Sequence, residues 1–320
     1  MKKAHLYLLF ILITTVSCNK EWEEELYNKD VSFVRNGVVN VYAKYKSQGG
    51  VVPVKVPVLL SGSTGNNEDI QVTIAIDKDT LDNLNFDRFR LRKDLYFIEL
   101  PEGNYSFQSM TTTIPKDSLE GFFNLNLRLE GMDMINKYIL PLKITATSKS
   151  NVNTRRWFSK SLMQIIPFND YSGVYSNAGQ MWNRDIPENK QTALSVGTRT
   201  AWVVNENTVF FFAGVLEEEA FERAKYKVYA KFNADSTVSL WSDNSAINFS
   251  QKRGTYTISK KMDEVQPYLE KTYVTMNLEY WFSDLSNPEY PINYRFTGPM
   301  TLEKVKNIQI PEEDQQVQMP

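Results

Sequence analysis

The chain has 320 residues, of which 13% are aromatic, and a formal net charge of −2. Its only histidine and its only cysteine, His5 and Cys18, both lie close to the N-terminus. The residues after Cys18 therefore lack both side chains, which excludes Ser-His-Asp and Cys-His catalysis and zinc sites built from these ligands. The nearly balanced charge, without a basic patch, argues against nucleic-acid binding.

Residues 1–17 have the layout of a signal peptide for export. Lys2 and Lys3 precede an apolar run at 6–13, which is too short to cross a bilayer as a helix. We expect cleavage before Cys18 and lipidation of its sulfur, so that acyl chains are the only membrane anchor. Thr15 stands where a lipoprotein signal usually has leucine. The alternative is ordinary cleavage that leaves a free thiol.

Residues 18–25 are predicted to form a lipidated, acidic tether. Lys20 is followed by Glu21 and by three further glutamates at 23–25. Charge runs are usually solvated segments, but this one also resembles the signal that directs Bacteroidetes lipoproteins to the outside of the outer membrane. We therefore expect an outer-membrane protein that faces the cell exterior, with a periplasmic location as the alternative.

Residues 26–166 are predicted to form a β-sandwich. Apolar and polar residues alternate in several short segments, at 52–60, 70–77, 123–130, 140–146 and 157–166. Pro53 and Pro57 remove amide donors from the first of these segments, which predicts a strand at a sheet edge. The acidic stretch 77–82 lacks the glycine and the closing glutamate of a calcium loop, so we expect Asp79 to cap a helical turn.

Residues 168–306, after a junction near Pro167, are predicted to form an antiparallel barrel. The strands expected here are longer and more aromatic, at 200–204, 209–213, 226–232, 237–241, 254–258, 273–282, 294–298 and 300–305. A short helix is expected at 217–225. The polar residues 307–320 are typical of a mobile tail.

Two groups of motifs resemble known domains. Residues 100–105, 113–115 and 138–144 resemble an immunoglobulin-like domain of uncharacterised function, which occurs at the N-terminus of Bacteroidetes lipoproteins and of some of their glycoside hydrolases. Residues 169–175 and 209–214, together with Arg199, resemble its companion, a lipocalin-like barrel. The resemblance implies an all-β chain, an immunoglobulin-like β-sandwich followed by a lipocalin-like antiparallel β-barrel. It further implies association with SusC/SusD-type glycan-uptake systems, and it supplies no catalytic residues, metal or cofactor.

Aromatic side chains in polar company are the candidates for glycan binding. A sugar ring stacks its apolar face on Trp or Tyr while its hydroxyl groups bond to polar side chains. Alternation places three aromatics on the polar faces of their strands, and a fourth lies in a polar loop. The glycan-binding candidates are Trp182, Trp241, Trp281, Tyr229, Arg184, Asp185, Asn277 and Glu279. Each aromatic could instead pack under a loop or against the other domain, and Trp202 is expected in the core.

The sequence predicts a non-catalytic surface lipoprotein that binds a polysaccharide or oligosaccharide for an outer-membrane uptake system. The alternative is a structural or assembly protein, such as a spacer, an adhesin subunit or a partner of SusC/SusD-type proteins. A glycosidase would need only two carboxylates, and Glu279 and Asp284 are the nearest candidates. We expect no enzyme activity.

Overall fold

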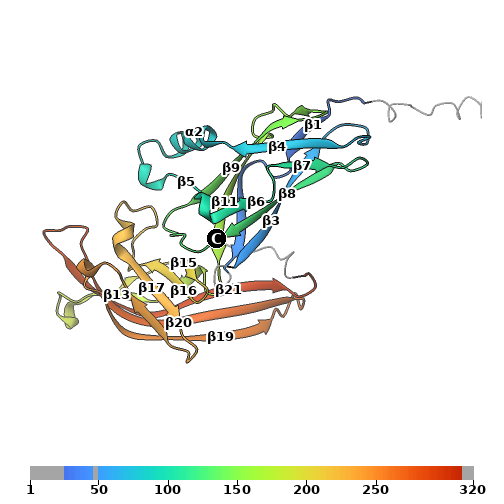
Figure 1. Ribbon diagram of the computed structural model, residues 1–320. Helices are drawn as coiled ribbons and strands as arrows, with labels where there is room; N and C mark the ends of the chain where they lie inside the picture. Colours follow the sequence, from blue (N-terminus) through green and yellow to red (C-terminus); the bar gives the residue numbers. More distant parts are fainter. Residues whose placement is uncertain (1–24, 46–49, 312–320) are drawn as a thin grey trace, which may run out of the picture.

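The computed structural model describes residues 25–45 and 50–311 (Figure 1). The earlier strands form two sheets that pack face to face, and the later strands form one sheet that curls on itself. The predicted all-β architecture, a sandwich followed by a barrel, is therefore confirmed. The predicted signal peptide, Cys18, the tether up to residue 24 and the tail from residue 312 lie outside the described residues.

The sandwich consists of a five-stranded and a six-stranded sheet. In spatial order the first contains β10 (Asn151–Val152), β1 (Asp30–Phe33), β3 (Val51–Leu60), β8 (Glu120–Arg128) and β6 (Tyr105–Phe107). The second contains β2 (Gly37–Lys44), β11 (Lys160–Phe168), β9 (Tyr138–Thr147), β4 (Ile70–Ile76) and β7 (Thr111–Ile114), with β5 (Ile98–Glu99) beside β9. Alternate residues of β8, among them Phe123, Leu125 and Leu127, are at most 1% exposed. Burying each contributes about 1.5–3 kcal/mol relative to an exposed side chain.

Strand β3 is an interior strand of its sheet, so the prediction of an edge strand was wrong for the strand as a whole. It pairs with β8 over most of its length, whereas β1 pairs only with Val58, Leu59 and Leu60. The Pro57 carbonyl accepts a hydrogen bond from the Val34 amide at 3.1 Å. The nitrogens of Pro57 and Pro53 therefore face the β1 side, where the ladder has already ended.

The one α-helix in the described part of the chain, α2 (Lys78–Phe89), is longer than the predicted helical turn. Its N-cap is Asp77 and not Asp79: the Asp77 carboxylate accepts hydrogen bonds from the backbone amide and the hydroxyl of Thr80, at 3.3 and 2.6 Å. Lys160 lies 3.5 Å from the same carboxylate. The acidic stretch is thus a helix start, fixed to the sheet through β11.

The sheet formed by the later strands, the third of the molecule, closes into a ring of eight strands. The order is β12 (Gly173–Asn177), β15 (Arg199–Asn205), β16 (Thr208–Phe212), β17 (Lys227–Phe232), β18 (Val238–Trp241), β19 (Ser250–Met262), β20 (Leu269–Asp284) and β21 (Ile292–Asn307), with β13 (Gln180–Asn183) and β14 (Leu194–Ser195) beside β21. A bridge between Thr237 and Thr255 joins β18 to β19. Gly254 permits this contact, because a Cβ atom there would lie 2.2 Å from the Val238 carbonyl oxygen. The Gln251 side chain bonds to Val238 and Leu240 and completes the closure.

Two local predictions for this sheet were wrong. The strands expected at 294–298 and 300–305 are one strand, β21, which passes through Gly298 at a φ of +146°. Gly298 is required there because its Cβ position lies 2.4 Å from the Cα of Gly179. The helix expected at 217–225 is a series of turns that ends in a 3₁₀ helix, Arg223–Tyr226.

The sandwich and the barrel share an apolar core. Strand β16 is buried on both faces: Val209 and Phe211 point into the barrel, whereas Phe210 and Phe212 join the core of the sandwich. In Figure 1 the β15–β17 side of the barrel faces the sandwich. The junction is therefore packed by side chains from both domains.

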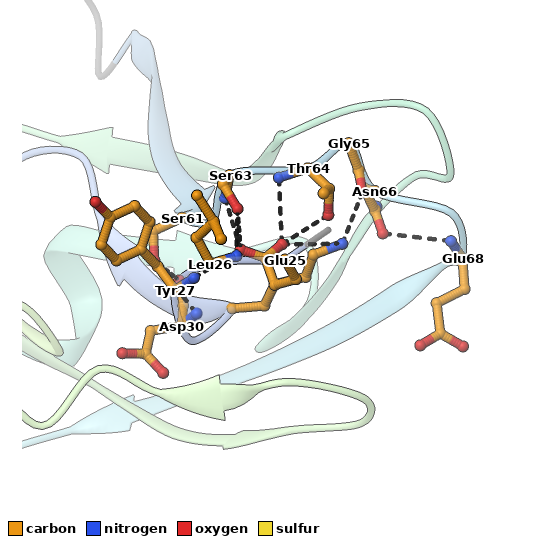
Figure 2. A network of polar contacts seen from close by, with 11 residues as sticks. Glu25, Leu26, Tyr27, Asp30, Ser61, Ser63, Thr64, Gly65, Asn66 and Glu68 are labelled. Atoms are coloured by element: carbon orange, nitrogen blue, oxygen red, sulfur yellow. Dashed lines mark hydrogen bonds and ion pairs between the residues drawn. The ribbon is translucent and has the colours of Figure 1, made fainter. Parts of the chain in front are cut away.

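The first described residue, Glu25, is fixed to the sandwich (Figure 2). Its carboxylate accepts hydrogen bonds from the backbone amide of Ser63 at 2.6 Å, and from the amide and hydroxyl of Thr64 at 3.2 and 2.6 Å. Lys29 lies 3.7 Å away. These bonds, the Ser63 amide foremost, hold the pKa of Glu25 well below its ordinary value. The end of the acidic tether is thus part of the folded domain.

The Glu25 contact predicts an unusual titration. Because the folded-state pKa is depressed, the carboxylate stabilises the docked segment above its ordinary pKa of 4.5 and loses this effect only as the pH falls below that value. The amide proton shifts of Ser63 and Thr64 should therefore stay constant from about pH 7 to about pH 4. Glu25→Gln should displace both shifts at every pH. A midpoint near 4.5 in NMR titration of the unaltered protein would contradict the contact.

Candidate functional site

A row of four aromatic side chains crosses the face of the barrel that meets the sandwich. The register pairs Trp202 with Phe210, Phe210 with Tyr229, and Tyr229 with Trp241. Residues paired in this way lie on the same face of a sheet. Trp202, which was expected in the core, packs against the core that the sandwich shares with the barrel, but it is only half-buried and points out of the barrel, toward the sandwich.

The connection between β8 and β9 covers the middle of this row. Met132 and Met134 of this connection share a core with Phe210. Asp133 accepts hydrogen bonds from the Lys227 ammonium at 2.6 and 2.7 Å, and this ammonium also lies 4.7 Å from the centre of the Phe210 ring. The cover leaves Trp202 on one side and the Tyr229–Trp241 pair on the other.

A cleft of about 240 Å³ opens between the domains on the Trp202 side. The barrel contributes Thr200 and Trp202 of β15. The sandwich contributes aromatic and amide side chains, namely Tyr42, Tyr96, Asn40, Asn136 and Gln164. Domain interfaces are favoured positions for small-molecule sites, and these combine apolar walls with a few polar groups.

The sandwich wall of the cleft comes from the parallel pair of β2 and β11. Asn40 lies opposite Gln164, and Tyr42 lies opposite Ile166, while the intervening residues Val41 and Ile165 are buried in the sandwich core. The amide of Asn40 lies 3.4 Å from the Tyr42 hydroxyl. Side-chain amides offer both donors and acceptors, which suits the hydroxyl groups of a sugar.

An ionic contact between the domains closes one end of the cleft. Asp94 of the sandwich binds the Arg92 guanidinium through both oxygens at 2.9 Å, and Arg223 of the barrel lies 3.2 Å from the same carboxylate. The hydrogen bonds from Arg92 and then Arg223, opposed by partial desolvation, lower the pKa of Asp94 to about 2. Arg92 also stacks on Phe221 of the barrel, 4.0 Å from its ring centre. These contacts fix the width of the cleft.

A second hollow lies beside the Tyr229–Trp241 pair. The two rings are stacked, with centres 5.2 Å apart and planes inclined by 13°, and Trp241 is 38% exposed. Asp243 and Asn244 line this hollow together with Tyr229. Desolvation, and then a hydrogen bond to Asp243, raise the pKa of Tyr229 to about 12. The structure thus brings the half-buried Tyr229 and the exposed Trp241 together as a stacked pair with acceptors beside it.

The other two predicted tryptophans lie on a different face of the barrel. The register runs from Trp182 of β13 to Arg295 of β21, then to Trp281 of β20. The Arg184 guanidinium and the Lys252 ammonium lie 3.6 and 3.8 Å from the centre of the Trp281 ring. Trp281 is therefore covered by cations and is not an open stacking surface.

The remaining predicted residues surround Trp281 or support its neighbours. Glu279 forms an ion pair with Arg295 at 3.0 Å, and Asn277 lies on the same side of β20 as Glu279. Asp185 accepts two hydrogen bonds from Asn293, both at 2.8 Å, which lower the pKa of this carboxyl. Asp185 therefore holds the loop after β13 in place. Alternation placed Glu279 and Asn277 on the side of β20 that carries Trp281, as the register shows, but gave no indication of the cleft.

The carboxylates considered for hydrolysis do not form a pair. Glu279 and Asp284 are five residues apart on β20, so they point to opposite faces of the strand. Asp284 accepts a hydrogen bond from the Tyr226 hydroxyl at 3.2 Å. Within residues 25–45 and 50–311, no group of three or more His, Cys, Asp or Glu side chains could hold a metal ion.

Comparison with known proteins identifies the relatives of this chain. Residues 22–148 match the model of a domain of unknown function (DUF4973), and residues 159–301 match the model of a C-terminal domain. A Bacteroides ovatus protein of unknown function is 35% identical, with a TM-score of 0.81, and the match covers 91% of this chain and 100% of that one. The chain belongs to the same family as this Bacteroides protein.

Two other solved Bacteroides structures match this chain over nearly the full length of both proteins. A multidomain protein from Bacteroides ovatus is 35% identical, with a TM-score of 0.80 over 90% of this chain and 99% of that one. An auxiliary nutrient binding protein from Bacteroides thetaiotaomicron is 30% identical, with a TM-score of 0.78 over 88% and 95%. The predicted membership of a Bacteroidetes family is thus confirmed. No curated protein matches the chain.

Helices long and apolar enough to span a membrane do not occur in the described part of the chain.

Proposed function

We propose that this protein is a non-catalytic surface lipoprotein that binds a complex glycan for an outer-membrane uptake system, and that the cleft between its domains holds the sugar. The observation that carries the proposal is the composition of the cleft, which is lined by four aromatic residues, Phe212 among them, and by three residues with side-chain amides. Trp202, Tyr42 or Tyr96 offers a stacking surface for a sugar ring, and the amides bond to its hydroxyl groups. The relative described as an auxiliary nutrient binding protein supports a binding role.

The size of the cleft limits what it accepts. Its 240 Å³ is slightly below the ~300–1,000 Å³ typical of sites for drug-sized ligands. We therefore propose that one or two sugar rings enter the cleft and that the rest of the glycan lies outside. The Tyr229–Trp241 pair, with Asp243 beside it, is then a second contact for the same polymer.

A single contact of this kind is weak. Stacking and a few hydrogen bonds to exposed groups suit a Kd near 1 mM, which corresponds to about −4 kcal/mol. Many anchored copies that meet one polymer on a cell surface raise the avidity without new contacts. Weak sites are therefore compatible with capture of polysaccharide.

The proposal predicts retention by neutral polysaccharide. Intact protein should migrate more slowly in native gels that contain its glycan, and a glycan array should identify the sugar class. The monomeric sugar at high concentration should release the retained protein, which separates binding in a site from trapping by the gel. Absence of binding on both the array and a broad set of gels would favour the structural alternative.

One observation favours that alternative, a structural or assembly protein. Leu91 and Phe221 are 92% and 71% exposed, and Arg92 between the domains stacks on Phe221. Exposed apolar side chains rimmed by charge are typical of protein contacts. A SusC/SusD-type partner would be the occupant expected from the family context, and loss of its co-purification in Leu91→Ser and Phe221→Ser variants would support this role.

A further inference from the structure

A second face of the barrel gathers positive charge around an aromatic ring. We call it the Trp281 face and define it by Trp182, Arg184, Lys252, Arg253, Glu279, Trp281 and Arg295. Three cross-strand pairs, Trp182–Arg295, Arg295–Trp281 and Arg253–Glu279, place most of these side chains on one side of the sheet. Arg184 and Lys252 join them through their contacts with the Trp281 ring.

The positive charges of the Trp281 face are poorly neutralised. Among the described residues, only Arg295 of these four cations has a carboxylate within ion-pair distance, that of Glu279 at 3.0 Å. Asp185 lies close to Arg184, but both of its carboxylate oxygens accept hydrogen bonds from Asn293. Arg184, Lys252 and Arg253 therefore form an exposed positive cluster on a chain whose net charge is −2.

The cluster is ordered in advance by the indole ring. Long cationic side chains normally lose rotamer freedom when they bind a ligand, but Arg184 and Lys252 already rest on Trp281, at 3.6 and 3.8 Å from its centre. The Nε1 atom of Trp281 is buried and has no hydrogen-bond partner within the described residues. A buried donor without an acceptor is rare in folded proteins.

We infer that the Trp281 face binds the carboxylate or sulfate groups of an acidic glycan. Arg184, Lys252 and Arg253 bind the anionic groups, Trp281 holds the first two of these cations in place, and Trp182 supplies a ring for the apolar face of a sugar. The side chains of the Trp281 face lie on four neighbouring strands, from β13 to β19, and so span about 14 Å. An extended glycan that crosses this face can contact it with several sugar units. The inference rests on the proposed function in one respect, that the ligand is a glycan. The site itself is separate, because the residues of the Trp281 face do not line the cleft.

Native gels that contain matched polymers test this inference. The unaltered protein should be retarded by polygalacturonate or by dextran sulfate and much less by dextran, which lacks the charge. The retardation should fall as NaCl rises from about 0.15 to about 1 M, because the screening length shortens from about 8 to about 3 Å. Equal retardation by dextran and dextran sulfate would overturn the inference.

Variants assign the binding to this face. Arg184→Gln/Lys252→Gln should weaken binding to the acidic polymer at least about tenfold, which corresponds to about 1.4 kcal/mol. The matched control is Lys55→Gln/Arg88→Gln, which removes the same charge and the cation–π contacts of these residues with Phe122, Phe89 and Phe97 in the sandwich. An equal loss in this control would mean that net charge alone is responsible.

Two further readouts keep the outcomes distinct. The indole N–H resonance of Trp281, assigned with Trp281→Phe, should shift when polygalacturonate fragments bind. Trp202→Ala should leave the affinity for the acidic polymers unchanged. If the unaltered protein binds a neutral glycan but no acidic polymer, this inference is overturned while the proposed function stands. Binding to phosphatidylglycerol vesicles but to neither acidic polymer would instead assign the face to lipid headgroups and would also overturn it.

Discussion

Replacement of Phe210 by alanine is expected to destabilise the protein by about 3–5 kcal/mol. Phe210 is 1% exposed and lies in the core that the sandwich shares with the barrel. The cavity would form between the domains, because the side chain points out of the barrel and belongs to the same core as Met132 and Met134 of the sandwich. Chemical denaturation should therefore show a lower midpoint and the separation of one transition into two.

Phe211→Ala is the matched control for this variant. Phe211 is the next residue of β16, is also 1% exposed, and belongs to the core of the barrel alone. Its loss should cost a similar ~3–5 kcal/mol but should lower the stability of the barrel without uncoupling it from the sandwich. Identical unfolding profiles for the two variants would contradict the shared core.

Replacement of Cys18 by alanine is expected to move the protein from the membrane fraction to the soluble fraction. Each methylene of an acyl chain buried in the bilayer contributes about 0.8 kcal/mol, so the several acyl chains proposed at this sulfur would be the main membrane anchor. Cys18 is the only cysteine, which makes the substitution specific. Fractionation of cells that express the two forms measures the effect. Cys18→Ala protein that stays with the membrane would contradict the proposed anchor.

The acidic residues behind Cys18 are expected to control exposure on the cell surface. Alanine at Glu21, Glu23 and Glu24 should leave the protein anchored but protected from protease added to whole cells. Glu25 is kept in this variant because its carboxylate is bonded to Ser63 and Thr64 and belongs to the sandwich. Unchanged surface labelling would indicate that these residues are a simple tether and not a signal for export to the cell surface.

The sequence predicted those parts of the fold that depend on local patterns. Alternation in 123–129 and in 273–282 identified β8 and β20, because one face of each strand is buried and the other is solvated. Prolines were less informative about the position of a strand in its sheet, and acidic residues were less informative about the start of the helix. Pro57 is tolerated in an interior strand because β1 ends beside it, and Asp77 caps α2 because Thr80 follows at the required spacing. Both outcomes depend on neighbours that a single segment does not specify.

The candidate site was harder to predict than the fold. Alternation found the polar neighbours of Trp281, and it found Tyr229 and Trp241 without indicating that they stack. The cleft was missed because its wall depends on the parallel pairing of β2 with β11, which are more than 100 residues apart in the chain. The apolar neighbours on both sides of Trp202 hide which face of β15 its side chain occupies. A signal was present in β16, where five consecutive apolar or small residues indicate burial on both faces.

The central claim is that the cleft between the domains binds a neutral sugar. It is tested most directly by titration calorimetry of the unaltered protein and of Gln164→Ala and Trp202→Ala with one oligosaccharide that the array identifies. We expect each cleft variant to keep its fold and to bind the sugar about tenfold or more weakly, which corresponds to about 1.4 kcal/mol, whereas Trp281→Phe should bind this neutral sugar normally. Unchanged affinity in both cleft variants would contradict binding in the cleft.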